Sequence, residues 1–311
     1  MNPLYLDMDP GIDDAMALIL ATGIAVIEGL TTVAGNVDGD RTYRNAWHIL
    51  KKIGQQNIPL IQGSSRPLFY PLDSAAHIHG VEGLGNDSPQ DADVPLSSYK
   101  AWHWLAQKWH ESPHAVDVVA TGPLTNLARL SLAYPDAFNA VARVIIMGGS
   151  LSGGNVTSTA EFNFYADPDS AEIVLRDVPK VEMIGLDVTR QSGLDESDRA
   201  RLLEFGAIGQ WLYDLLGFYA EQIRRAGAPS DRLVVHDAVA LFAWHHPEAF
   251  QWQAVRLGVV REGVWRGTVV ADPRDLSRPQ VRVATSLDRE QFVQWIFDGL
   301  AQVRDRDGKF S

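Results

Sequence analysis

The sequence predicts an α/β fold: a Rossmann-like, open and mostly parallel sheet with helices on both faces, plus a helical C-terminal half and a small antiparallel β element. The first observation is that short β-type runs alternate with amphipathic helical stretches through the first half of the chain, which is the pattern of repeated βαβ units. The second is that acidic, amide and glycine residues directly follow the predicted strands. In such sheets the ligand binds outside the carboxyl ends of the strands.

The predicted strands are short apolar runs, whereas the predicted helices are longer stretches with apolar residues every three or four positions. In chain order, the strands are Leu4–Asp7, Ile27–Ala34, Pro59–Gly63, Ala115–Ala120, Arg143–Met147 and Val181–Leu186. They alternate with helices over Asp13–Ala21, Tyr43–Ile53, Tyr99–Glu111, Leu124–Ala133 and Ser170–Arg176. Four of these strands are followed by the acidic, amide and glycine-containing segments. These segments are Asp9, Gly35-Asn36, Thr121-Gly122 and Gly148-Gly149.

The second half is predicted to be helical over Glu196–Ala226, antiparallel β over Gln253–Thr285 around Asp272-Pro273, and helical again over Arg289–Val303. Two long loops, Ser64–Ser98 and Gly148–Asp167, are rich in Gly, Pro and polar residues. Long loops in compact domains are usually lids or binding loops. No internal repeat or linker interrupts the chain, so we expect one domain over residues 1–311.

The composition is ordinary for a globular enzyme, with 46% hydrophobic and 21% charged residues among 311. A net charge of −12 would repel polyanions, so we expect no nucleic acid partner and no binding to an anionic membrane. The lack of cysteine excludes disulfides, thiol nucleophiles and zinc–thiolate sites. The longest near-apolar run, Ala15–Ile27, is too short to span a bilayer, and no signal-peptide pattern is seen, so we expect a cytoplasmic protein.

The first predicted strand and the turn after it carry four carboxylates, on Asp7, Asp9, Asp13 and Asp14. Pro10-Gly11 makes a sharp turn, which places the last two at the start of the first helix. Asp is favoured there as a capping residue, but capping explains one or two carboxylates and not four. Because close carboxylates repel each other, the cluster predicts a bound divalent cation with oxygen ligands.

Two further segments carry polar groups. His236-Asp237 precedes a helical apolar pattern, where Asp237 alone would be an N-cap. Combined with the acidic turn, Asp237 becomes a candidate metal ligand and His236 a candidate proton donor. The loop Gly154–Asn163 offers amide and carboxylate groups that suit a neutral polyhydroxylated ligand, although a polar surface loop looks the same. His77 and His79 lack a third nitrogen ligand nearby, so a transition-metal site is not favoured.

Together these segments resemble the nucleoside hydrolase family of the inosine-uridine-preferring type. The similar blocks are Asp7-Met-Asp9-Pro-Gly-Ile-Asp13-Asp14, Thr31-Thr-Val-Ala-Gly-Asn36, Ile78-His79-Gly80 with Gly83-Leu-Gly85, Ala120-Thr121-Gly-Pro-Leu-Thr-Asn126, Met147-Gly-Gly, Gly154-Asn155 to Asn163, and His236-Asp237. They occur in the family's order and span nearly the whole chain. The resemblance implies a Ca²⁺-dependent enzyme of purine and pyrimidine salvage, a homodimer or homotetramer, that hydrolyses the N-glycosidic bond of ribonucleosides to ribose and free base.

The resemblance also implies a role for each site residue. Ca²⁺ would be bound by Asp9, Asp14, Asp237 and the main-chain carbonyl of Thr121. Asp9 would activate the metal-bound water, which Asn36 would help to place. The ribose hydroxyls would be held by Asp13, Asn155, Glu161 and Asn163, in a pocket lined by Met147 and Phe162. The base would face His79, Tyr219 and His236, with His236 assisting its departure as an acid.

One helix departs from the family's pattern. Many relatives carry spaced tyrosines before the His-Asp pair, whereas here Tyr219 has no second tyrosine after it. Tyr219, Gln222 and Arg224 are therefore the candidates for contact with the base, and the base preference stays open. His236 argues against the strictly purine-specific branch, whose members resemble each other in lacking this histidine.

Two other functions compete with this interpretation. A phosphatase of the haloacid dehalogenase type also begins with a strand and Asp-x-Asp, but it needs Thr or Val two residues after the second aspartate, where this chain has Gly11. A non-catalytic, calcium-dependent binder of nucleosides or ribose would keep the ligand-binding residues and lose the general base. Asp9 is present, which favours the enzyme.

Overall fold

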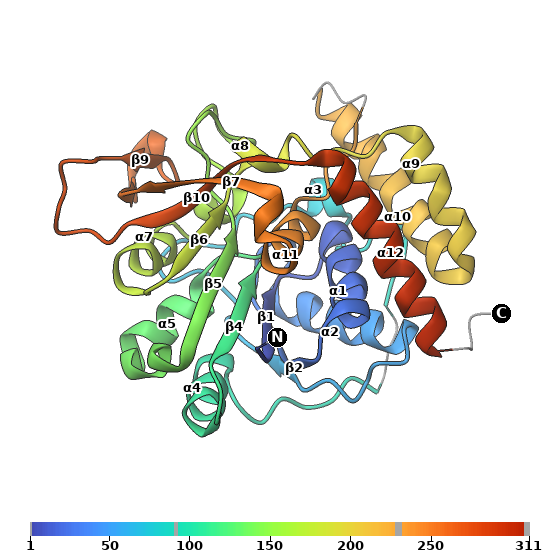
Figure 1. The fold of residues 1–311 in the computed structure, drawn as a ribbon, viewed down its shortest axis with the longest axis horizontal. Helices are drawn as coiled ribbons and strands as arrows, with labels where there is room; N and C mark the ends of the chain where they lie inside the picture. The colour runs from blue at the N-terminus through green and yellow to red at the C-terminus, as the bar shows by residue number, and fades with distance from the viewer. Residues whose placement is uncertain (1, 90–92, 228–231, 308–311) are drawn as a thin grey trace.

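The structure is a computed structural model that describes residues 2–89, 93–227 and 232–307. Its centre is an eight-stranded sheet with the order β3-β2-β1-β4-β5-β6-β10-β7 (Figure 1). The strands are β1 (Leu4–Met8), β2 (Ile27–Thr32), β3 (Leu60–Gln62), β4 (Val116–Ala120), β5 (Val141–Met147), β6 (Val181–Ile184), β7 (Phe250–Val255) and β10 (Val281–Leu287). Every neighbouring pair is parallel except β7 with β10. The predicted open, mostly parallel sheet is confirmed.

Helices cover both faces of this sheet (Figure 1). One layer contains α1 (Ile12–Ile24), α2 (Gly39–Lys52), α10 (Gly206–Arg225), α11 (His236–His245) and α12 (Arg289–Asp307). The opposite layer contains α4 (Ala101–Glu111), α5 (Thr125–Ala133) and α7 (Pro168–Asp177). The shorter helices are α3 (Ala76–His79), α6 (Phe162–Ala166), α8 (Leu186–Thr189) and α9 (Glu196–Arg201), with 3₁₀ turns at Pro135–Ala140, Leu202–Phe205, Pro247–Ala249 and Gly263–Trp265. None of the helices in these described ranges is long and apolar enough to cross a membrane.

The central strands divide the hydrophobic core into two parts. Leu4 and Leu6 of β1 pack with the α1 layer, whereas Tyr5 between them packs with the α4 layer. Successive side chains of a strand point to opposite faces, so this alternation follows from the backbone alone. Because helices lie on both faces, all five residues of β1 are buried. This burial explains why the central strands are continuous apolar runs instead of alternating patterns.

Three parts of the fold differ from the prediction. The loops predicted over Ser64–Ser98 and Gly148–Asp167 contain the short helices α3 and α6, and the last residue of the predicted strand Val181–Leu186 begins α8. The strands on either side of Asp272-Pro273 do not pair with each other. Instead β10 joins the main sheet between β6 and β7, while β8 (Leu257–Val259) and β9 (Val269–Ala271) form the small antiparallel sheet.

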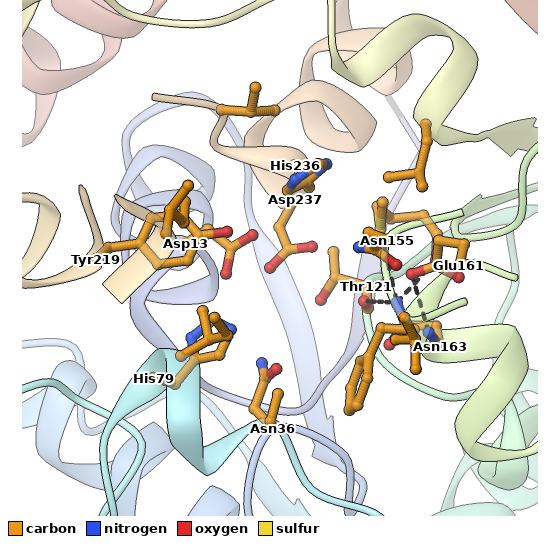
Figure 2. Close-up of a pocket in the computed structure, with 18 of the residues that line it drawn as sticks. Asp13, Asn36, His79, Thr121, Asn155, Glu161, Asn163, Tyr219, His236 and Asp237 are labelled. Atoms are coloured by element: carbon orange, nitrogen blue, oxygen red, sulfur yellow. Dashed lines mark hydrogen bonds between the residues drawn. The ribbon is translucent and has the colours of Figure 1, made fainter. Parts of the chain in front are cut away.

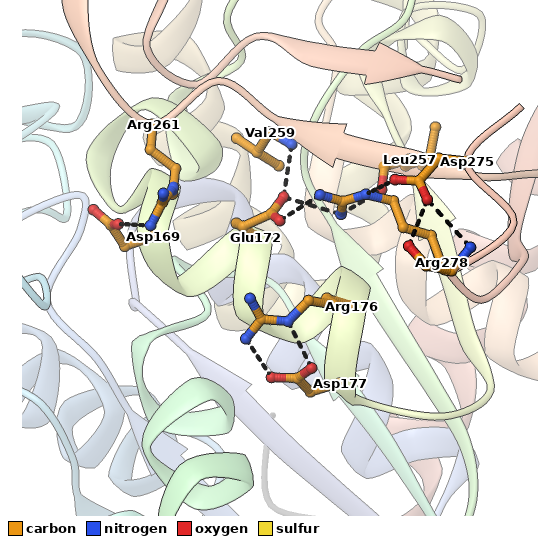
Figure 3. Close-up of polar contacts among 10 residues, drawn as sticks. Asp169, Glu172, Arg176, Asp177, Leu257, Val259, Arg261, Asp275 and Arg278 are labelled. Atoms are coloured by element: carbon orange, nitrogen blue, oxygen red, sulfur yellow. Dashed lines mark hydrogen bonds and ion pairs between the residues drawn. The ribbon is translucent and has the colours of Figure 1, made fainter. Parts of the chain in front are cut away.

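Ion pairs attach this small sheet to α7 (Figure 3). Glu172 of α7 accepts hydrogen bonds from the Arg278 guanidinium at 2.6 and 3.2 Å and from the main-chain amide of Val259 at 2.9 Å. Arg278 also donates to the carbonyl of Leu257 at 3.0 Å. These contacts matter for the rest of the molecule because Thr268, just before β9, forms a β-bridge with Ala160 in the long loop before α6.

Candidate active site

The loops that follow β1, β2, β4 and β5 meet at the carboxyl edge of the sheet, as predicted. They surround a cavity of about 900 Å³ (Figure 2). Of the residues predicted to form the site, those that line this cavity are Asp9, Asp13, Asn36, His79, Thr121, Met147, Asn155, Glu161, Phe162, Asn163, Tyr219, His236 and Asp237. Asp14, the remaining one, is completely buried behind them.

Four carboxylates come together at the bottom of the cavity, on Asp9, Asp13, Asp14 and Asp237. Each of these residues is at most 5% exposed. Asp13, Asp14 and Asp237 each contribute one carboxylate oxygen to a group whose atoms all lie within 4.8 Å of one another. Burial is the main cause that raises the pKa of all four carboxyl groups, that of Asp13 to about 7. Buried carboxylates that repel each other are stabilised by a cation. This cluster could therefore hold a metal ion.

Asp7 does not belong to this cluster, although the sequence places it in the same acidic segment. Its carboxylate accepts hydrogen bonds from the Thr31 hydroxyl at 2.6 Å and from the Asn126 side chain at 2.7 Å. Burial raises the pKa of Asp7 to about 6 despite these two bonds. Asp7 thus ties β1 to β2 and to the start of α5, and the prediction of one site from four neighbouring carboxylates was wrong for this residue.

Asp9 is held in place by the loops after β2 and β4. The main-chain amide of Asn36 donates to its carboxylate at 2.7 Å, and the Asn36 side chain donates to the Asp9 carbonyl at 3.0 Å and to Asp14 at 3.1 Å. A Cβ atom on Gly35 would lie 2.1 Å from an Asp9 carboxylate oxygen, and one on Gly122 would lie 2.7 Å from the other. The two glycines that follow these strands are therefore needed because no side chain fits beside Asp9.

Asp14 and Asp237 both lie in the first turn of a helix. Asp14 accepts from the main-chain amide of Gly11 at 2.9 Å and from the Thr121 hydroxyl at 2.8 Å, so it also caps α1. Asp237 is the second residue of α11, and the N-cap position of this helix is occupied by Val235. The capping explanation that the sequence allowed for Asp237 is therefore wrong, and its carboxylate is available to the cluster.

The opposite wall of the cavity carries amide and carboxylate groups from the loop before α6. Glu161 caps α6 and accepts from the main-chain amides of Asn163 at 2.9 Å, Phe164 at 3.1 Å and Gly149 at 2.8 Å. Burial nevertheless raises its pKa to about 7. The Asn163 side chain donates to the main-chain carbonyls of Thr121 at 2.7 Å and Met147 at 3.1 Å. These bonds connect the ends of β4 and β5 to α6.

The segment that carries Asn155 is fixed by residues of α8 and its C-cap. The Arg190 guanidinium donates to the carbonyls of Gly154 at 2.6 Å and Gly153 at 3.3 Å. Asp187 of α8 accepts from the main-chain amide of Leu151 at 2.8 Å. On the other side, the β-bridge between Ala160 and Thr268 holds the same loop against the small sheet.

The third wall of the cavity is formed by His79, Tyr219 and His236 (Figure 2). The ring centroids of His79 and Tyr219 are 5.4 Å apart with the planes tilted by 31°. His79 Nδ1 accepts from the main-chain amide of Ile12 at 3.1 Å, and His236 Nδ1 lies 2.8 Å from the Thr189 hydroxyl. Burial is the main cause that lowers the pKa of His79 to about 3 and that of His236 to about 4. Both imidazoles are therefore neutral at physiological pH.

Some lining residues were given no role in the site from the sequence. The additional ones are Ala75, His77, Ile78, Gly154, Val156, Leu186, Arg190, Ile223, Ala226, Arg232 and Val234. On α10 and its C-cap the lining consists of Tyr219, Ile223 and Ala226, and the second and third lie four and seven residues after Tyr219, which is the spacing of one helix face. Gln222 and Arg224, the polar candidates for contact with the base, are not part of the lining. The helical spacing was the signal that could have identified the residues of this segment that line the cavity.

The comparison with protein families agrees with this geometry. Residues 4–294 match the model of a family described as inosine-uridine preferring nucleoside hydrolase. The chain belongs to this family. Among its relatives are the non-specific ribonucleoside hydrolase RihC of Salmonella typhi, 36% identical over 306 residues, and the pyrimidine-specific ribonucleoside hydrolase RihA of Citrobacter koseri, 34% identical over 310 residues. Both alignments cover 96% of this chain and 98% of the relative.

Solved structures give the same result for the fold. A plant nucleoside hydrolase superposes with a TM-score of 0.91 at 32% identity, covering 96% of this chain and 98% of the plant chain. A purine-preferring ribonucleoside hydrolase from Gardnerella vaginalis superposes with a TM-score of 0.91 at 26% identity, covering 98% of this chain and 100% of the Gardnerella chain. This nucleoside hydrolase is thus an enzyme of ribonucleoside hydrolysis. The names of its relatives describe non-specific, pyrimidine-specific and purine-preferring enzymes, so similarity alone does not fix its base preference.

Proposed function

We propose that this nucleoside hydrolase uses Ca²⁺ to cleave the N-glycosidic bond, with Asp9 as general base and His236 assisting the departure of the base. The observation that carries the proposal is the composition of one cavity. Carboxylates and amides, all of them buried except the amide of Asn155, occupy two of its walls, and neutral histidines with a tyrosine occupy the third. A ribonucleoside matches this arrangement, because its polyhydroxylated sugar suits the carboxylates and amides and its aromatic base suits the histidines and the tyrosine.

The cation would be held by Asp9, Asp14, Asp237 and the main-chain carbonyl of Thr121. Oxygen donors and a flexible arrangement are what Ca²⁺ prefers, and the raised pKa values of the carboxyl groups fit a site that a cation neutralises. When bound, such a cation lowers the pKa of water and orients hydroxyl groups. Asp13 also lies within the group of close carboxylate oxygens, but we assign it to the sugar, as the resemblance to the family implies.

Asp9 would accept the proton of the attacking water, which Asn36 would orient from the loop after β2. Cleavage leaves positive charge on the ribose ring. Asp13, Asn155, Glu161 and Asn163 would bind the hydroxyls and stabilise that charge, and Met147 and Phe162 would exclude solvent from the sugar. The departing base gains electron density, so a hydrogen-bond donor on the opposite wall favours its release. His236 would supply that donor.

Membership of the family argues against the haloacid dehalogenase-type phosphatase. A calcium-dependent binder without turnover is the remaining alternative, and the presence of Asp9 beside Asn36 disfavours it. The single-domain organisation, the oligomeric state and the cytoplasmic location remain predictions from the sequence.

The proposal is tested by measuring reducing-sugar release from inosine, adenosine, guanosine, uridine and cytidine, with and without a calcium chelator. We expect release that the chelator abolishes and that added Ca²⁺ restores, and the ranking of the five nucleosides gives the base preference. Release that persists in the chelator contradicts the metal requirement. Binding of all five without any release, by folded protein in Ca²⁺, supports the binder instead.

A further inference from the structure

The hydrogen bond to His79 determines which of its ring nitrogens carries the proton. The main-chain amide of Ile12 donates to His79 Nδ1 at 3.1 Å. A main-chain amide can only donate, so Nδ1 must be unprotonated. A neutral imidazole then carries its one proton on Nε2. In the part of the chain that the structure describes, no hydrogen bond is made to this Nε2, and His79 lines the cavity.

The hydrogen bond to His236 is ambiguous from geometry alone, because a hydroxyl can donate or accept. Thr189 Oγ1 and His236 Nδ1 are 2.8 Å apart. Thr189 is completely buried, and within residues 2–89, 93–227 and 232–307 its hydroxyl has no other hydrogen-bond partner. If Nδ1 donated to it, the hydroxyl proton would be buried without an acceptor, which costs free energy. The hydroxyl therefore donates, and the proton of neutral His236 is also on Nε2.

We propose that Thr189 and the Ile12 amide fix His236 and His79 as Nε2–H tautomers, so that the base end of the cavity presents two N–H donors. Thr189 is then a positioning residue, because it acts on the substrate only through His236. The base that fits must offer lone pairs, on a ring nitrogen or a carbonyl oxygen, towards these donors. Purine and pyrimidine bases both meet this condition, whereas a base edge made of amino groups does not. The catalytic consequence rests on the proposed role of His236.

The tautomers can be measured without any activity assay. Long-range ¹H–¹⁵N correlation spectra of the ¹⁵N-histidine-labelled protein in Ca²⁺ distinguish protonated from unprotonated ring nitrogens. The signals are assigned with the His79→Gln and His236→Gln variants. We expect both histidines of the wild-type protein to be protonated on Nε2 alone. A proton on Nδ1 of either ring overturns the proposal, whatever the enzyme's kinetics.

Two matched variants then test the positioning role. Thr189→Val keeps the shape of the side chain and removes the donor, whereas Thr189→Ser keeps the donor. We expect Thr189→Val to move His236 towards the Nδ1–H form and to lower kcat on natural ribonucleosides by about 3- to 10-fold, the range of one hydrogen bond. A nitrophenyl riboside, which needs no proton donor, should be cleaved at nearly the wild-type rate. Thr189→Ser should restore both the spectrum and kcat.

An equal loss on both substrate types with an unchanged His236 spectrum would mean that Thr189 serves packing only. A failure of the proposed catalytic role of His236 can be distinguished from a failure of the tautomer assignment. If His236→Ala slows natural ribonucleosides and the nitrophenyl riboside equally, His236 is not the group that assists departure. The spectra of the wild-type protein still decide the tautomers in that case.

Discussion

Asn163 donates its side-chain amide to the main-chain carbonyl of Thr121 across 2.7 Å. The bond joins α6 to the end of β4, and it fixes the direction of a carbonyl that we propose as a metal ligand. The same amide group also binds the Met147 carbonyl at 3.1 Å. A single side chain thus orients the ends of two neighbouring strands at the cavity.

Asn163→Ala should weaken Ca²⁺ binding by about 10- to 100-fold, as is typical when a residue that orients a metal ligand is removed. Calorimetric titration of the substrate-free protein measures this. Asn155→Ala is the matched control, because Asn155 lines the cavity but forms no hydrogen bond with Thr121 among the described residues. It should leave Ca²⁺ affinity unchanged and raise KM. Equal weakening by both substitutions would contradict the assignment of the Thr121 carbonyl.

Asp9→Asn should lower kcat by about 10³-fold, within the range attributed to general acid–base catalysis, while ribose still binds. The amide keeps an oxygen in place but cannot accept the proton of water. Steady-state kinetics at saturating Ca²⁺ and ribose titration provide the two readouts. Asp13→Asn, in the same cluster, should mainly weaken ribose binding. Normal turnover in Asp9→Asn would rule out Asp9 as the base.

Gly35→Ala should lower kcat by about 100-fold, because its Cβ would lie 2.1 Å from the Asp9 carboxylate and force it to move. Gly54→Ala is a control with open space around the new Cβ. It has a positive φ of 66°, so it should cost about 1 kcal/mol of stability and leave kcat unchanged. Thermal unfolding and kcat of both variants separate the two effects. Full activity in Gly35→Ala would show that Asp9 tolerates displacement.

Removal of Ca²⁺ should lower the unfolding temperature, because the cation relieves repulsion among buried carboxylates in the folded state only. At a concentration about a thousand times Kd, the cation stabilises the folded protein by about 4 kcal/mol. Scanning calorimetry with a chelator and with increasing Ca²⁺ measures the shift, and Mg²⁺ in place of Ca²⁺ tests selectivity. Asp237→Asn should reduce the shift. An unfolding temperature independent of Ca²⁺ would contradict a metal in this cluster.

Arg278→Ala should destabilise the protein by about 2 kcal/mol, since it leaves the poorly exposed Glu172 without its charged partner. Arg274→Ala removes a guanidinium that pairs with Asp272 but is 89% exposed, and it should not change the unfolding midpoint. Denaturant unfolding of the two variants checks this. Equal effects would mean that the contacts between α7 and the small sheet contribute little to stability.

Much of the fold and the site follows from local patterns. The parallel sheet was predictable because its central strands are buried on both faces and appear as short apolar runs. Asp9, Asn36 and Thr121 were predictable because each lies just beyond a strand, and parallel strands end at one edge. The position of β10 in the sheet was not predictable, because β10 pairs with β6 between residues that are far apart in the sequence, such as Met183 and Val283.

The remainder of the site depends on contacts that no local pattern records. Thr189 belongs to the four-residue helix α8, which is too short to give a periodic signal, and it contacts His236, 47 positions away. Arg190 reaches Gly154, 36 positions away. On α10 the periodic signal existed, but polarity suggested Arg224. That side chain is instead exposed and pairs with Glu221.

β1 is the first strand of the chain and lies in the middle of the sheet, between β2 and β4. On the ribosome, Asp9 and Asp14 therefore emerge long before α11 delivers Asp237. If this cluster holds the proposed cation, its set of carboxylates is complete only after α11 has been synthesised, so the cation can stabilise the fold only late in synthesis. A chain terminated before α11 would lack Asp237, and the proposed cation should then protect it less against proteolysis than it protects the full-length chain.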